Sequence, residues 1–143
     1  HLGPYAALLG TDLDPHAVEA ARANLARAGV ERAVVEAIDA LAFAPRGLRA
    51  IVTNPPMGRR VERGTHGELL ERFVERAAEL LPEGGSITWV VPEPKRIRAA
   101  AERSGLRVAR AITVDMGGFP AEMSVYVKET SGRSRPSASR KRR

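Results

Sequence analysis

Segments typical of strands alternate with segments typical of helices along most of this 143-residue chain. Short apolar runs predict strands, and apolar residues at helical spacing predict the helices between them. The expected strands cover 5–12, 33–39, 48–54, 86–91, 108–114 and 123–127, and the expected helices 15–28, 65–81 and 94–103. Because parallel strands need a crossover between them, this order predicts a parallel α/β sheet with helices on both faces.

The last two expected strands have only a short link between them, Gly117-Gly118-Phe119-Pro120. A link of this length holds no crossover helix, so the final strand should be antiparallel to its predecessor. We expect it at the edge of the sheet.

Two of the expected helices have recognisable start signals. Asp14 precedes Pro15 at the first helical position, which is typical of an N-cap, and Gly29 should end the same helix. Thr65 and Glu68 match a capping box. The apolar stripe of that second helix comprises Leu70, Phe73, Val74, Ala77 and Leu81.

Composition limits the class of protein. At 15.4 kDa the chain holds one domain at most, and 43% hydrophobic residues suffice for a core. It has no cysteine, which excludes disulfides and cysteine-based metal sites. No apolar stretch approaches the ~18 residues of a membrane span, and no segment resembles a signal peptide. We therefore expect a cytoplasmic protein without membrane contact.

The formal net charge of +6 resides in the C-terminal tail. Residues 133–143 carry six basic and no acidic side chains, which leaves 17 Lys and Arg against 17 Asp and Glu in the rest. A domain over 1–129 followed by a disordered basic tail over 130–143 is therefore predicted. The tail could add salt-sensitive affinity for phosphates, or it could be a solubilising extension.

A carboxamide and two prolines follow the third expected strand directly, as Asn54-Pro55-Pro56-Met57. The prolines lack an N–H and fix φ, so this segment continues neither sheet nor helix easily. It can hold the Asn54 side chain and the Pro55 carbonyl as rigid hydrogen-bond acceptors. Such a pair suits a site that grips a planar amino group.

Polar residues end successive expected strands at Asp12, Asp39 and Asn54. Ligands of parallel sheets bind beyond the carboxyl ends of the strands. A carboxylate there can accept both hydroxyls of a ribose, which suits Asp12, and Asp39 could accept from an adenine amino group. The alternative is that both are ordinary turn residues, while Asp14 is better explained as a helix cap.

Other kinds of site have little support. His16 and His66 should lie in first helical turns and face solvent, and no His, Asp or Glu cluster has metal-ligand spacing. Ser86 and Ser124 have no partner base, so a nucleophilic triad is not indicated.

The run 10–15, then Asp39, then Asn54-Pro55-Pro56 resembles the S-adenosylmethionine-dependent amino-methyltransferases with an Asn-Pro-Pro motif. With Arg59-Arg60 and the 117–120 link, it is most similar to the catalytic C-terminal part of the THUMP-domain tRNA and rRNA guanine-N2 methyltransferases. The resemblance covers nearly all of 1–129 and implies a Rossmann-like sheet.

That resemblance implies roles for individual residues. Asp12 would bind the S-adenosylmethionine ribose, Asp39 and Ala40 the adenine, and Leu13 would also contact the cofactor. Asn54, beside the methyl-bearing end of the cofactor, would hold the target amine together with Pro55 and Pro56. Met57, Arg59, Arg60 and Phe119 would contact the RNA substrate, tRNA or rRNA.

The chain also departs from the pattern of these enzymes. Many relatives carry an aromatic residue in place of Met57, which is a weaker stacking platform. Phe119 could stack on a base, or it could anchor the hairpin. No segment matches the first strand and glycine-rich loop, so we expect a C-terminal part of a longer protein that is marginally stable alone.

Three functions follow as alternatives. The first is methyl transfer to guanine N2 in RNA. The second keeps the chemistry but takes adenine N6 of DNA or RNA, or a protein glutamine. The third is a non-catalytic remnant that binds nucleic acid through its tail. None of them needs a metal ion, and the oligomeric state is left open.

Overall fold

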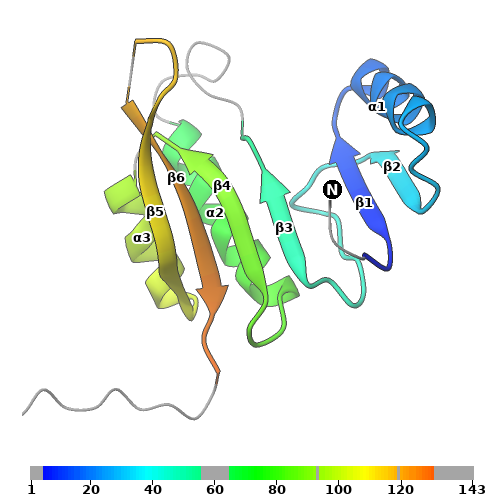
Figure 1. Cartoon of the computed structure of the whole chain (residues 1–143). Helices are drawn as coiled ribbons and strands as arrows, with labels where there is room; N and C mark the ends of the chain where they lie inside the picture. Colours follow the sequence, from blue (N-terminus) through cyan, green and yellow to red (C-terminus); the bar gives the residue numbers. More distant parts are fainter. Residues whose placement is uncertain (1–4, 56–64, 93, 119, 131–143) are drawn as a thin grey trace, which may run out of the picture. The chain divides into compact units, whose positions relative to one another are not determined.

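The computed structural model describes residues 5–55, 65–92, 94–118 and 120–130 (Figure 1). The chain divides into two compact units, His1–Pro45 and Arg46–Arg143, and each is described by itself.

The first unit is a parallel strand pair with a crossover helix. Strand β1 (Leu8–Asp12) leads into helix α1 (Pro15–Arg27) and returns to strand β2 (Ala33–Ala37). The predicted start of α1 is confirmed, because the Asp14 carboxylate accepts a hydrogen bond from the His16 backbone N–H. Gly29 follows the helix with a φ of 68°, a backbone angle that residues other than glycine rarely adopt.

The second unit is a four-stranded sheet with two helices. Its elements are β3 (Ala50–Thr53), α2 (Thr65–Leu80), β4 (Ser86–Val91), α3 (Pro94–Arg103), β5 (Leu106–Asp115) and β6 (Pro120–Lys128). The strand order is β3-β4-β6-β5, with β3 and β4 parallel and β6 antiparallel to both of its neighbours. The alternation of strands and helices predicted from the sequence is thus confirmed.

The predicted position of the final strand is wrong, although its direction is right. Strand β6 lies between β4 and β5, so β5 forms the edge. Strand β5 suits an edge because residues 109–113 are all exposed and because it carries Arg107 and Arg110. Strand β6 instead buries every second side chain along much of its length, which an interior strand does.

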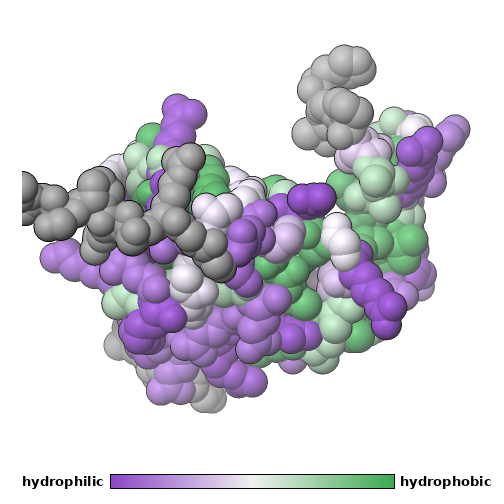
Figure 2. Space-filling model, turned by 90° about the horizontal axis from the view of Figure 1, so that it is seen from below, coloured by the Kyte–Doolittle hydropathy of each residue, from purple (hydrophilic) through white to green (hydrophobic). Residues whose placement is uncertain are grey.

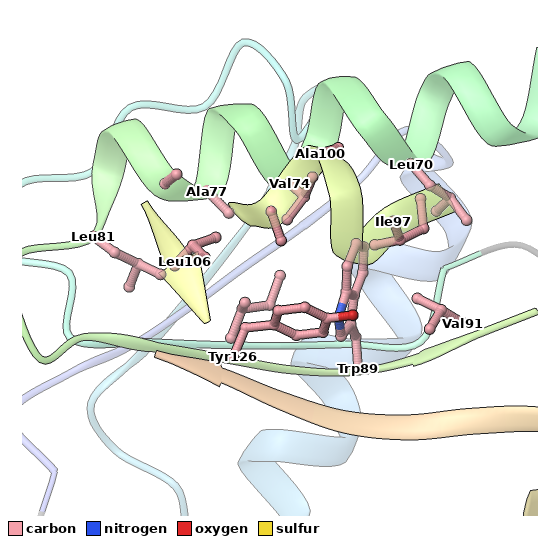
Figure 3. Close-up of a cluster of buried hydrophobic side chains, with 13 residues drawn as sticks. Leu70, Val74, Ala77, Leu81, Trp89, Val91, Ile97, Ala100, Leu106 and Tyr126 are labelled. Atoms are coloured by element: carbon pink, nitrogen blue, oxygen red, sulfur yellow. The ribbon is translucent and has the colours of Figure 1, made fainter. Parts of the chain in front are cut away.

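The core of the second unit lies between the sheet and its two helices. Ile87, Trp89 and Val91 alternate along β4 and face the helices, which lie behind the sheet in Figure 1. Leu70, Val74, Ala77 and Leu81 of the predicted stripe pack here (Figure 3). Phe73 is partly buried against the same cluster. The cluster comprises Leu70, Val74, Ala77, Ala78, Leu81, Ile87, Trp89, Val91, Ile97, Ala100, Ala101, Leu106 and Tyr126.

Ion pairs connect the helices on the outside of this layer. Glu71 of α2 pairs with Arg96 of α3 at 2.9 Å, and Glu75 with Arg103 at 3.9 Å. Hydrogen bonding by Arg96 lowers the pKa of Glu71 below its usual value. Figure 2 shows mainly hydrophilic side chains on the left, over the second unit, with hydrophobic ones among them.

Helices on both faces of one sheet remain a prediction, because α2 and α3 share one face and α1 belongs to the other unit. Within the described ranges, β1 and β3 each pair with a strand along one edge only. No helix in those ranges combines the length and the apolar character that a membrane crossing needs.

Replacing Val74 by Ala should lower the free energy of unfolding by about 2 kcal/mol, because two fully buried methyl groups are lost and leave a cavity. Val52→Ala is the matched control, since Val52 is 82% exposed and its loss should cost less than about 0.5 kcal/mol. Urea unfolding of both variants provides the measurement. Equal destabilisation would contradict the assignment of the core to the face between β4 and α2.

Candidate active site

The first unit brings two predicted carboxylates to one end of its strand pair. Asp12 is the last residue of β1, and its carbonyl accepts a hydrogen bond from the N–H of Ile38, 3.0 Å away. Asp39 therefore emerges beside Asp12 at the carboxyl end. Leu13 and Ala40 follow them, and all four predicted residues are exposed.

Each carboxylate also stabilises a turn with one of its oxygens. Asp12 Oδ1 accepts from the Asp14 N–H at 2.9 Å, and Asp39 Oδ1 accepts from the Leu41 N–H at 2.9 Å. Within the described residues, the second oxygen of each makes no hydrogen bond. Both are thus turn residues, as the alternative held, and each still offers an acceptor to a ligand.

In the second unit, Asn54 follows β3 at the carboxyl end of the sheet. Asn54 is exposed and Pro55 is buried, so the chain is anchored directly behind the carboxamide. Helix α2 must begin at this same end, because it returns the chain to the start of the parallel strand β4. Of the other residues predicted here, Pro56, Met57, Arg59 and Arg60 lie outside the described residues.

The β5–β6 hairpin lies at the same end as Asn54. Strand β5 is antiparallel to β6, which is antiparallel to β4, so β5 runs with β3 and β4. Asp115 Oδ1 accepts from the N–H groups of Gly117 at 3.1 Å and Gly118 at 2.9 Å, and these glycines have φ values of 83° and 103°. Phe119 lies outside the described residues, so its predicted role is untested.

Two arginines of α3 hold this end of the unit together. Arg96 reaches Glu71 on α2, and Arg98 donates to Glu122 near the start of β6. The Arg96 guanidinium, the flexible end of that side chain, occupies the space that a Cβ at Gly67 would take.

The expectation that both histidines face solvent is half right. His16 is 92% exposed, but both ring nitrogens of His66 are buried without a hydrogen-bond partner. Neighbouring Gly67 is also buried, and the Arg96 side chain of α3 lies beside it. No three His, Asp or Glu residues in the described parts of the chain gather as metal ligands would.

One group of polar side chains was not predicted from the sequence. Glu122, Ser124 and Tyr126 alternate along β6 and point into the core side of the sheet beside Trp89. Their spacing of two residues was the available signal, because it places all three on one face of a strand.

Comparison with known proteins supports a family assignment. Residues 3–121 match the family described as UPF0020, RMKL-like, methyltransferase domain. The ribosomal RNA small subunit methyltransferase C of Stutzerimonas stutzeri is 36% identical over 120 residues, which cover 76% of this chain and 35% of that protein. The ribosomal RNA large subunit methyltransferase K/L of Hahella chejuensis is 43% identical over 60 residues, 38% of this chain and 8% of that protein.

A solved structure extends the similarity to the fold. The crystal structure of TrmN from Thermus thermophilus superimposes with a TM-score of 0.72 and 26% identity, over 88% of this chain and 37% of that one. The chain thus spans about a third of the length of the first of these relatives and of TrmN. The predicted Rossmann-like methyltransferase fold is confirmed. Because the family match covers most of the chain, the chain belongs to the RMKL-like methyltransferase domain family.

Proposed function

We propose that this domain transfers a methyl group from S-adenosylmethionine to an exocyclic amine of an RNA base, namely guanine N2 of rRNA or tRNA. The observation that carries the proposal is the exposed Asn54 carboxamide on a buried Pro55, at the carboxyl end of a parallel sheet in a methyltransferase family. The relatives named as ribosomal RNA methyltransferases support RNA as the substrate.

Asn54 and Pro55 provide the chemistry that an exocyclic amine needs. The lone pair of such an amine is delocalised into the ring, which makes the nitrogen a poor nucleophile. The Asn54 carboxamide oxygen and the Pro55 carbonyl would accept its two hydrogens. This favours a pyramidal nitrogen and stabilises the positive charge that develops on it. Anchoring by the buried proline limits the reorganisation that the acceptors undergo.

The two carboxylates of the first unit fit the polar groups of the cofactor. Asp12 and Asp39 each keep an oxygen that makes no hydrogen bond within the described residues, and each is oriented by its turn bond. Asp12, followed by Leu13, would accept from ribose hydroxyls, and Asp39, followed by Ala40, from the adenine amine. When bound, the cofactor supplies the methyl group on a sulfonium.

The basic residues would hold the RNA in place. Arg59, Arg60 and the cationic tail would contact phosphates, which predicts binding that weakens as salt rises. A paired guanine would have to leave its stack before its amine reached Asn54. Met57 and Phe119 would then contact the extruded base.

The Asn54→Ala variant should lose methyl transfer by about 10²–10³-fold in kcat while cofactor affinity changes little, because an acceptor of the transition state is removed. Asn24→Ala, at an exposed position of α1, is the matched control and should retain full activity. The assay measures labelled methyl transfer to tRNA, rRNA and DNA, followed by digestion to nucleosides. It uses this chain and, if its gene continues beyond these residues, the longer product.

The labelled nucleoside decides between the substrates. N2-methylguanosine supports the proposal, whereas methyladenine would show that the enzyme methylates adenine N6 instead. An equal loss of transfer and of cofactor binding in Asn54→Ala would show that Asn54 holds the cofactor or the fold and not the amine.

The Asp12→Asn variant should weaken binding of S-adenosylhomocysteine about tenfold or more, because a charged acceptor for hydroxyl groups becomes a neutral amide. Asp14→Asn is the matched control. Asp14 is two residues away, is also exposed, and is bonded to a backbone N–H over the same 2.9 Å. Isothermal titration calorimetry gives both affinities, and equal affinities would contradict the role of Asp12.

A further inference from the structure

A group of polar side chains lies inside the otherwise apolar layer of the second unit. Glu122, Ser124 and Tyr126 occupy alternate positions of β6 and face α3. Trp89 of β4 is the register partner of Ser124. Arg98 reaches the same place from α3 through its bond to Glu122.

The polar atoms of this group are buried without hydrogen-bond partners. The side chains of Trp89, Ser124 and Tyr126 are 1%, 1% and 0% exposed. The unpaired atoms are Trp89 Nε1, Ser124 Oγ, the Tyr126 hydroxyl, Glu122 Oε1 and Arg98 Nε. A buried polar group without a partner lowers the stability of the fold, so a cluster of them calls for a shared partner.

The side chains converge above Ser124. The rings of Trp89 and Tyr126 meet edge to face, with centroids 6.0 Å apart, and Figure 3 shows the Tyr126 hydroxyl on the side of Trp89. Burial is the main cause that raises the pKa of the Tyr126 hydroxyl above its usual value. Serine is the smallest side chain of the group and stands between two longer ones on β6.

The chemistry of the group favours a small neutral partner. Arg98 and Glu122 form an ion pair, so their charges compensate and neither a cation nor an anion is favoured. Trp89 and Arg98 can only donate, Glu122 as a carboxylate can only accept, and Ser124 and Tyr126 can do both. A water molecule offers two donors and two acceptors and so complements this mixture.

We propose that one structural water is bound in the core of the second unit, between Trp89, Ser124 and Tyr126 and beside the Arg98–Glu122 pair. The water accepts from Trp89 Nε1–H and bonds to the hydroxyls of Ser124 and Tyr126 and to Glu122 Oε1. It links β4, β6 and α3 near the point where the hairpin enters β6. The site is distinct from the residues proposed to bind substrate and cofactor.

A high-resolution crystal structure of the chain tests the proposal directly. The expected result is a density peak within hydrogen-bond distance of Trp89 Nε1 and of at least two other members of the group. A direct bond from Trp89 Nε1 to Tyr126 or Glu122, with no peak between them, would overturn it.

Thermal unfolding provides a second test in solution. Ser124→Ala and Tyr126→Phe should each lower the midpoint by about 5 °C, since either removes a ligand of the water. The double variant should lower the midpoint by less than the sum of the two single decreases, because either change alone already disrupts the water site. Tyr5→Phe, at the chain's other tyrosine, which is 40% exposed, should leave the midpoint unchanged. Additive losses would count against a shared water.

Discussion

The parallel pairing of β3 with β4 is the constraint on which the second unit depends. It sends the chain from Thr53 across a helix and back to Ser86 before the next strand can form. That path places Asn54, the start of α2, the start of α3 and the β5–β6 hairpin at one end of the sheet. The residues proposed for chemistry in this unit gather there because the strands run in one direction, and not because they are close in the sequence.

Elements and their directions could be predicted from the sequence because their signals are local. The strand at 86–91 and the helix at 94–103 match the structure at both ends. The place of β6 between β4 and β5 could not be predicted, since strand order is decided by which faces and edges are buried. Helix α1 shows the same limit, because only Val18 of its predicted stripe is buried. A helix over two strands covers a small area, and Ala28 at the end of the stripe is left exposed.

The same limit applies to the candidate site, where only features with local sequence signals could be predicted. That Asp12 and Asp39 would emerge together followed from the strand-end rule, and the cap at Asp14 followed from a pattern within three residues. The buried nitrogens of His66 did not follow from any local pattern. The alternation of Glu122, Ser124 and Tyr126 placed them on one face of a strand but did not show that this face is buried. The burial of the polar group depends on contacts between segments far apart in the chain, through the β4–β6 register.

Turn formation and ligand binding are compatible roles for a carboxylate at a strand end. A turn bond takes one oxygen and fixes the plane of the group, so the second oxygen is presented to a ligand in a defined direction. The same logic applies to Asn54, which is exposed while Pro55 behind it is buried. A group that is anchored on one side and open on the other binds without first losing conformational freedom. Stability and function therefore need not compete at these positions, since the bonds that end each strand also orient the group that would act.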